Sequence, residues 1–146
     1  MRVLQIVKTN IGAKWAFGQA KWLFENGIEI ITVLPEIEGG MAEEYIQTNL
    51  QIVEGDFSLP ISAPWKILKK SLDFKEMIEK YKPDLLHCHF VTNVFFTRIV
   101  LRNSKIKRVF QVPGPLHLEN TFFKKIELLL SDKNDYWIGG CKKTCQ

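Results

Sequence analysis

The stretch KPDLLHCHF, residues 82–90, constrains the fold of this chain more than any other part of the sequence. Its Pro-Asp pair ends a helix, and an apolar, β-prone run follows. Such a run is typical of a strand buried on both faces of a parallel α/β sheet, where ligands gather at the carboxyl ends of strands. We expect His87 and His89 at that end, sharing one face with Leu85, and His89 close to solvent. The alternate residues should face the other side: Leu86, Cys88 and Phe90.

Hydrophobic periodicity predicts that βα units surround this central strand. Apolar runs predict further strands over 2–8, 28–34, 50–53 (an outer strand), 107–112 and 136–139. Helical spacing predicts helices over 13–26, 41–48, 93–102 and 122–130. Another helix is expected to start near Asp73, which would cap it with Glu76 at the third position. With 146 residues and no internal repeat, we expect a single α/β domain, a Rossmann-like parallel sheet flanked by helices over 1–146.

Composition narrows the class of protein. Apolar residues make up 46% and charged residues 25% of the chain, as in a folded domain. The net charge of +4 favours anionic partners such as phosphates or an acidic membrane surface, but not nucleic acid. Three cysteines, Cys88, Cys141 and Cys145, favour a reducing, cytoplasmic compartment, and we expect no metal site from the last two. The start of the sequence lacks the pattern of a signal peptide, and no apolar run is long enough for a membrane span.

A glycine turn after the first predicted strand invites comparison with dinucleotide-binding sites. Gly12 and Gly18 do not make the glycine triplet of that fingerprint, so no nicotinamide or flavin cofactor is expected. The backbone amides of Gly12 and Ala13 are candidates for binding an anion, because a helix N-terminus offers free donors. The alternative is a simple tight turn.

Four segments, in this order and spacing, resemble the N-terminal half of GT-B glycosyltransferases of the large retaining family 4. They are MRVLQIV with its glycine turn and helix, NGIEIITVLP, KPDLLHCHF and VFQVPGP. KPDLLHCHF matches that family most closely and places His87 on its usual histidine. The family commonly has His-Gly after the fifth strand, whereas here Pro113 precedes Gly114, and His117 is the candidate replacement.

The resemblance implies that this chain is the acceptor-binding half of an enzyme. Such an enzyme moves a sugar from a nucleotide-sugar donor to a glycan or lipid-linked acceptor, in polysaccharide or lipopolysaccharide biosynthesis. The donor would bind a C-terminal domain that this chain does not contain, present in cis or in a second chain, so we expect no activity from this chain alone. Metal is not generally needed in this fold. The alternatives are a non-catalytic subunit of a split two-chain enzyme and a small-molecule-binding α/β domain.

The candidate site residues lie at predicted carboxyl ends of strands. They are Gly12, Ala13, His87, His89, Gly114, His117 and Glu119. The loop carrying the last three is the stronger candidate, because loops at such ends carry sites. For His87 and His89 the alternative is a structural role. Trp15 and Trp22, two helical turns apart, are predicted to pack against a neighbouring helix.

A short basic amphipathic segment follows Pro64. Its apolar residues, Trp65, Leu68 and Leu72, share one helical face, and its lysines crowd another: Lys66, Lys69 and Lys70. Such a segment is typical of a contact with a membrane interface. The alternative is that the apolar face packs on the domain. We expect a cytoplasmic protein, with peripheral contact at the cytoplasmic face of the membrane if this segment binds lipid.

Overall fold

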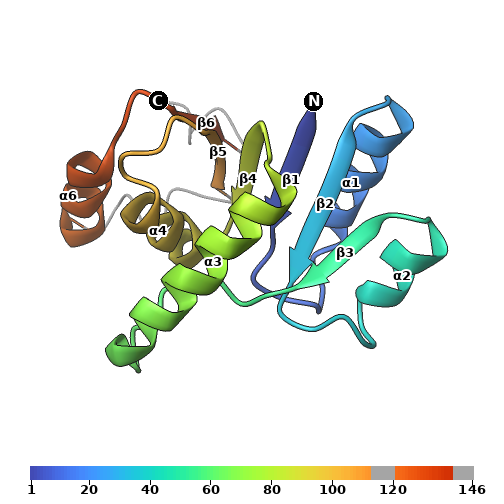
Figure 1. Cartoon of the computed structure of the whole chain (residues 1–146), viewed down its shortest axis with the longest axis horizontal. Coiled ribbons are helices and arrows are strands. Elements are labelled where there is room, and N and C mark those ends of the chain that lie inside the picture. Colours follow the sequence, from blue (N-terminus) through green and yellow to red (C-terminus); the bar gives the residue numbers. More distant parts are fainter. Residues whose placement is uncertain (113–120, 140–146) are drawn as a thin grey trace.

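The computed structural model describes residues 1–112 and 121–139, which form an α/β domain around a parallel sheet of six strands (Figure 1). The strands are β1 (Arg2–Ile6), β2 (Glu29–Leu34), β3 (Gln51–Glu54), β4 (Leu85–His89), β5 (Lys107–Val112) and β6 (Asp135–Gly139). The helices are α1 (Lys14–Glu25), α2 (Ala42–Gln47), α3 (Ile67–Tyr81), α4 (Val91–Val100) and α6 (Thr121–Leu130), with a 3-10 turn at Pro64–Lys66. All six predicted strands are present, and β3 is an outer strand as expected.

The sheet has the order β3-β2-β1-β4-β5-β6, so strand order reverses between β1 and β4. At this reversal Gln5 of β1 stands in register with His87 of β4. In open α/β sheets ligands bind outside the carboxyl ends of strands at such a point. This arrangement confirms the predicted Rossmann-like α/β fold.

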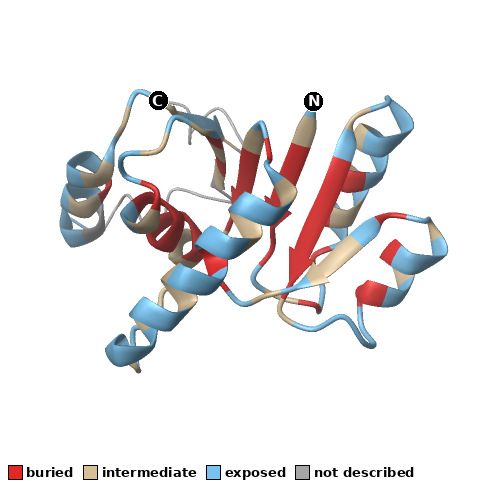
Figure 2. Ribbon diagram, viewed as in Figure 1, coloured by how far each residue is buried: buried red, intermediate tan, exposed pale blue. Residues whose placement is uncertain are grey.

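Helices cover the two faces of the sheet unequally. On one face α1 and α2 pack over β1 to β3 around Ala16, Ala20 and Tyr45. On the other face α3 and α4 pack around Phe74 and Phe96. Burial is therefore deepest in the central strands, which are sandwiched between the two helical layers (Figure 2).

The helix predicted from Asp73 begins earlier. Pro64 opens a 3-10 turn that continues directly into α3, so Asp73 lies inside the helix and caps nothing. Proline suits this position because the first turn of a helix leaves its N–H groups without intrahelical acceptors. α3 ends at Tyr81 and is followed by Lys82, whose backbone is left-handed (φ 46°) and whose N–H donates to the Ile78 carbonyl at 2.8 Å. The amphipathic segment is thus the first half of one long helix.

The predicted alternation of β4 holds for Leu86 and Cys88, which lie in the α3–α4 core, but it is wrong for Phe90. Phe90 has φ of 70°, so the extended backbone ends at His89. Its ring packs on the same side as the histidines, 5.8 Å from the ring of Trp15. Alternation depends on extended backbone and fails at the first residue that leaves it.

A buried ionic cluster joins α4, β5, α6 and β6, and nothing in the sequence predicted it. The Asp135 carboxylate accepts hydrogen bonds from Arg98 Nε (3.1 Å) and Arg108 Nε (2.6 Å). Arg98 also pairs with Glu127, and both arginines are about 1% exposed. Burial raises the pKa of Glu127, and the Arg98 charge opposes this shift. Each charge has a partner, so we assign the cluster a structural role.

Candidate functional site

The loops at the carboxyl ends of β1 and β2 are bound into one unit by Asn10. Its Nδ2 donates to the Gly39 carbonyl (2.9 Å), and its Oδ1 accepts the N–H of Ala42 at the start of α2 (2.9 Å). Gly40 makes this possible, because a Cβ there would lie 2.5 Å from the Asn10 carbonyl oxygen. Gly12 has φ of +74° and turns the chain towards α1. The sequence pattern pointed to the turn but missed the role of Asn10.

Ala13 stands at the start of α1, where no side chain caps the helix. Its methyl is buried, and its carbonyl accepts the N–H of Ala16 at 2.9 Å. Gly12 beside it is exposed. The predicted anion-binding turn therefore lies at the carboxyl edge of the sheet, and anion binding there stays a prediction.

His89 is buried rather than close to solvent, so that prediction was wrong. Its side chain is fully enclosed, and its Nε2 lies 3.1 Å from Gln5 Nε2. Gln5 Nε2 carries hydrogens and also donates to the Ala16 carbonyl, while Thr32 Oγ1 donates to Gln5 Oε1. His89 Nε2 must therefore be the acceptor, which requires a neutral ring. Burial, with His87 nearby, lowers the pKa of His89 to about 2, in agreement with that assignment.

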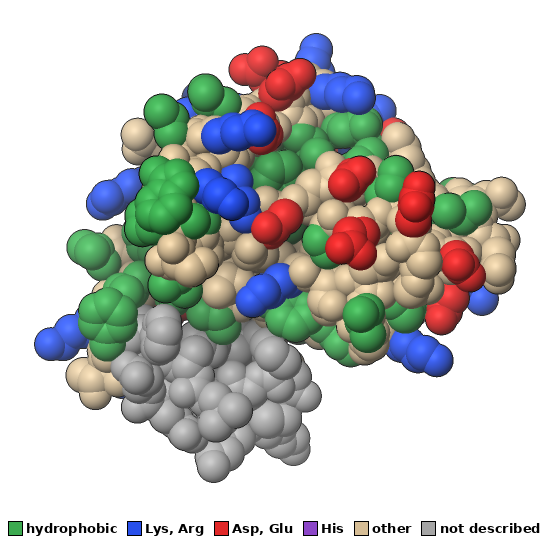
Figure 3. Space-filling view, turned by 90° about the horizontal axis from the view of Figure 1, so that it is seen from below, with side chains coloured by type: hydrophobic (Ala, Val, Ile, Leu, Met, Phe, Trp, Pro, Cys, Tyr) green, Lys and Arg blue, Asp and Glu red, His purple; other side chains and the backbone are tan. Residues whose placement is uncertain are grey.

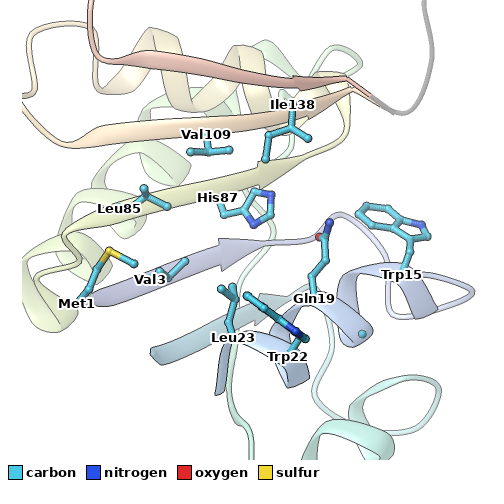
Figure 4. A pocket seen from close by; sticks show the side chains of 11 residues that line it. Met1, Val3, Trp15, Gln19, Trp22, Leu23, Leu85, His87, Val109 and Ile138 are labelled. Carbon is cyan, nitrogen blue, oxygen red and sulfur yellow. The ribbon is translucent and has the colours of Figure 1, made fainter. Parts of the chain in front are cut away.

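His87 lies next to it, with ring centroids 4.2 Å apart. Only 7% of His87 is exposed, and no described residue hydrogen-bonds its Nε2. Burial lowers the pKa of His87 to about 4, against the opposing effect of a hydrogen bond with Gln111. Unlike His89, His87 lines a cavity of about 610 Å³ between α1 and the face of β4 to β6 (Figure 4). This cavity lies along the sheet face, between α1 and β6, rather than at the carboxyl edge.

The two tryptophans of α1 border the same cavity, contrary to the prediction that they pack on a neighbouring helix. Trp15 lies over the end of β4, edge-on to His89, and Trp22 is 61% exposed. Their two-turn spacing put them on one side of the helix as expected. That side of α1 borders the cavity over the sheet rather than another helix.

At the carboxyl edge lies a hollow of about 430 Å³ between the start of α4, the loop after β3 and the start of α3. Its polar lining includes Lys8, Lys66, Lys70 and Ser58. Lys70 Nζ contacts Asp56 at 2.7 Å and the Ser58 carbonyl at 3.0 Å. Burial raises the pKa of Asp56, but hydrogen bonds from Lys70 and Ser58 outweigh it and hold this pKa below its usual range. No ion pair within the described residues involves Lys8 or Lys66.

A second hollow, of about 540 Å³, adjoins the first and shares Leu59, Ile61 and Thr92 with it. Apart from Thr92, its lining is wholly hydrophobic: Leu59, Ile61, Val91, Phe95, Ile99, Phe122 and Ile126. The first hollow draws on residues from Lys8 to Thr92 and the second on residues from Leu59 to Ile126, so no local sequence pattern could reveal them. The first hollow therefore provides basic side chains, and the adjoining second hollow provides hydrophobic ones.

The amphipathic segment is exposed beside these hollows. Trp65, Leu68 and Leu72 are 76%, 69% and 59% exposed, so the alternative that they pack on the domain is wrong. Lys66 and Lys69 are exposed as well, whereas Lys70 is engaged by Asp56. Viewed from the carboxyl side of the strands, hydrophobic and basic side chains gather where α3 begins, and several acidic ones lie towards α2 (Figure 3).

No described helix has both the length and the apolar character needed to cross a membrane. Within 1–112 and 121–139 no group of His, Cys, Asp or Glu could hold a metal ion. Several predicted residues fall outside the described part of the chain: Pro113, Gly114, His117, Glu119, Cys141 and Cys145. Their roles stay predictions.

The profile of the family described as "Glycosyl transferase 4-like" matches residues 15–133. Solved structures similar to this chain include MurG from Acinetobacter baumannii (15% identity, 96% of this chain, 46% of that one, TM-score 0.62). A protein from Listeria monocytogenes assigned as a UDP-N-acetylglucosamine 2-epimerase has 14% identity and a TM-score of 0.67, and the match covers 98% of this chain and 40% of that one. A glycosyltransferase from Rickettsia africae has 17% identity and a TM-score of 0.62, and the match covers 94% of this chain and 42% of that one. The chain spans less than half of each, and at these identities the likeness shows the fold alone. No curated protein sequence matches the chain.

Proposed function

Because this chain belongs to the glycosyl transferase 4-like family, we propose that it forms the acceptor-binding half of a glycosyltransferase. A nucleotide-sugar donor would bind a second domain, in the same polypeptide or in a partner chain. The two halves would meet at the carboxyl edge of the sheet, where α/β folds place their ligands. In this proposal the chain alone transfers no sugar.

One observation carries the choice of acceptor: the lysine-lined hollow at the carboxyl edge shares Leu59, Ile61 and Thr92 with a second hollow, whose other lining residues are all hydrophobic. A glycan would find few polar partners in the apolar hollow. An amphiphile with a phosphate head group matches both ends, because Lys8 and Lys66 supply positive charge and the second hollow buries hydrocarbon. This favours a lipid-linked acceptor over a free glycan, as in polysaccharide or lipopolysaccharide assembly.

The neighbouring surface supports the same proposal. Trp65 in the 3-10 turn and Leu68 and Leu72 on α3 are exposed beside Lys66 and Lys69, which is the composition of an interfacial helix. An enzyme that takes its acceptor from a bilayer needs such a contact. We therefore propose a peripheral location at the cytoplasmic face of the membrane.

The proposed sugar transfer requires the enzyme to position its substrates more than it requires a nucleophilic side chain. The acceptor hydroxyl displaces the nucleoside diphosphate at the anomeric carbon, and the enzyme must orient both and stabilise the leaving phosphate charge. His89 is buried and held neutral by Gln5, so it has no place in that step. His117 and Glu119 stay the candidates for contacts with the acceptor or with developing charge.

Calorimetry on the isolated chain tests this proposal. Dodecyl phosphate, below its critical micelle concentration, should bind, whereas dodecyl maltoside and a panel of UDP- and GDP-sugars should not. The double change Lys8→Ala and Lys66→Ala should weaken binding of the phosphate amphiphile at least tenfold, about 1.4 kcal/mol. Lys69→Ala, which removes an exposed lysine that does not line the hollow, is the control. Equal affinity for both amphiphiles, or micromolar binding of a nucleotide sugar, would contradict the proposal.

A further inference from the structure

The second hollow is a groove that follows one flank of α4. Val91, Phe95 and Ile99 recur at steps of four residues, so they lie one turn apart on that flank, and all three line the hollow. Phe122 and Ile126 have the same spacing on α6, which packs beside α4, and they line the hollow as well (Figure 1). Two neighbouring helices therefore form the long hydrophobic walls of a groove that runs along α4.

The groove has a basic end at the start of α4. The Leu59 N–H donates to the Thr92 carbonyl at 3.1 Å, which holds the loop after β3 against the first turn of this helix. Leu59, Ile61 and Thr92 line both hollows, so the first hollow, with Lys8 and Lys66, adjoins the groove at that turn. An amphiphile whose phosphate lies beside these lysines would therefore extend its chain along α4 from its first turn.

The opposite end of the groove lies at the last turn of α4. Ile99 and Ile126 are the last residues along the two helices that line the hollow. α4 ends one residue after Ile99, and the chain continues into Arg102 and Asn103, which are exposed. Hydrocarbon that extends past Ile99 therefore leaves the groove. The lining thus sets a limit to the length of chain that the described residues can cover.

The rise of α4 gives this length. From Val91 to Ile99 the helix rises by about 12 Å, at about 1.5 Å per residue. An extended chain covers about 3.6 Å for every three bonds, so a groove of about 12 Å holds about ten carbons. We propose that the second hollow binds about the first ten carbons of the acceptor's hydrocarbon chain and leaves any further carbons outside the protein. This inference rests on the proposed function and adds the size of the lipid segment that the site recognises.

Calorimetry with a series of alkyl monophosphates, from hexyl to tetradecyl phosphate, tests the length. Each is titrated into the isolated chain below its critical micelle concentration. Burial of one methylene corresponds to up to about fourfold in affinity. The groove is open on one side, where Ile61 and Phe122 are 70% and 66% exposed, so about twofold per carbon is expected. Affinity should rise in this way from hexyl to decyl phosphate and then stay level to tetradecyl phosphate.

The other outcomes separate this inference from the proposed function. A rise that continues to tetradecyl phosphate, or an affinity independent of chain length, would overturn the length limit alone. Alkyl maltosides that bind as tightly as the phosphates, with the same level point, would contradict the phosphate head group and leave the length limit in place. A dimer that dissociates when alkyl phosphates are added would show that a second copy of the chain fills the groove, and would overturn the inference. Absence of binding by every amphiphile would contradict both proposals.

A variant that shortens the groove provides a second measurement. Ile99→Trp places a larger side chain at the far end, and because Ile99 is 42% exposed the fold should accommodate it. Loss of one helical turn, about 5.4 Å, should move the level point from about ten to about six carbons. Decyl phosphate should then bind tenfold or more weakly, whereas hexyl phosphate should bind as it does to the parent and report an intact site.

Leu128→Trp is the matched control. Leu128 is 69% exposed on α6 and does not line the hollow, so this variant should keep the chain-length dependence of the parent. Equal weakening of all chain lengths by Ile99→Trp, or a level point that the change does not move, would overturn the inference.

Discussion

The indole ring of Trp15 stands edge-on to the imidazole of His89, with ring centroids 4.6 Å apart and an interplanar angle of 70°. Trp15 is on α1 and His89 is the last residue of β4, so the contact closes the carboxyl end of the central strand from one side. Gln5, on the neighbouring strand β1, hydrogen-bonds His89 Nε2. A histidine that the sequence placed at the cleft is therefore part of the core.

His89→Ala should lower stability rather than only activity. The change removes the acceptor for Gln5 and leaves a buried amide hydrogen unpaired, which costs about 1–3 kcal/mol, and it adds a cavity beneath Trp15. Urea unfolding of the isolated chain measures the loss. His89→Gln, which keeps an acceptor, should lose less. Unchanged stability of the alanine variant would return His89 to the list of cleft residues.

Stability should fall as pH drops below about 6.5, through the buried histidines. The pKa of His87 is lowered to about 4 and that of His89 to about 2, whereas in the unfolded chain both titrate near 6.5. In this window the unfolded chain binds protons that the folded chain does not, so unfolding is favoured by about 1.4 kcal/mol per pH unit for each histidine. Above pH 6.5 both histidines are neutral in the folded and in the unfolded chain, so they no longer make the stability depend on pH.

The comparison of parent and His87→Gln isolates this effect from the titration of carboxylates. Unfolding free energies are measured at pH 7 and pH 5. The difference between the two pH values should be smaller in the variant. An identical pH dependence would show that His87 titrates normally in the folded chain.

Asp135→Asn should destabilise the domain by about 3 kcal/mol or more, because it leaves the buried guanidinium groups of Arg98 and Arg108 short of negative charge. Glu25→Gln offers a matched control, since Glu25 forms an exposed pair with Lys21 at 3.8 Å and should cost under about 1 kcal/mol. Chemical denaturation measures both. Similar losses in the two variants would argue against a buried structural cluster.

The exposed start of α3 should bind anionic membranes weakly and reversibly. Liposome sedimentation with and without anionic lipid should show binding by the parent at low salt, and reduced binding by Trp65→Ala and by Lys66→Glu with Lys69→Glu. Each lysine near an anionic surface adds about 1 kcal/mol. Lys70 is left unchanged because it pairs with Asp56.

Charge reversal at Lys105 and Lys107, exposed before and at the start of β5, controls for net charge. Those changes should leave membrane binding nearly intact. If they reduce it as much as the changes on α3, the attraction is general rather than local to this helix.

His117→Ala and Glu119→Ala, made in a complete enzyme, should each lower turnover tenfold or more, about 1.4 kcal/mol of transition-state stabilisation. The melting temperature should change little if these residues contact the acceptor or stabilise developing charge. Steady-state kinetics and thermal melting, measured on the same preparations, separate the two roles. A variant that loses stability with its turnover preserved would make its residue structural.

Local pattern alone was enough for the architecture. Apolar runs such as LLHCH of β4 and EIITVL of β2 identified the parallel strands, and the placement of turns between them predicted the βα order. These inferences succeed because secondary structure follows from residues close in sequence, through backbone geometry and the period of the apolar side chains. The start of α3 was missed because Pro64 opens a turn that the capping pattern at Asp73 obscured.

Which side chains are accessible was decided only by the tertiary structure. His89 is buried because Trp15 and Gln5, more than seventy residues earlier, lie against it, while Trp65 and Leu68 stay exposed because no described element packs over them. The two hollows, the cavity that His87 lines and the Asp135 cluster likewise form between distant segments. Sequence periodicity shows which face of a helix or strand a side chain lies on. Whether that face is buried depends on which other segments of the folded chain pack against it.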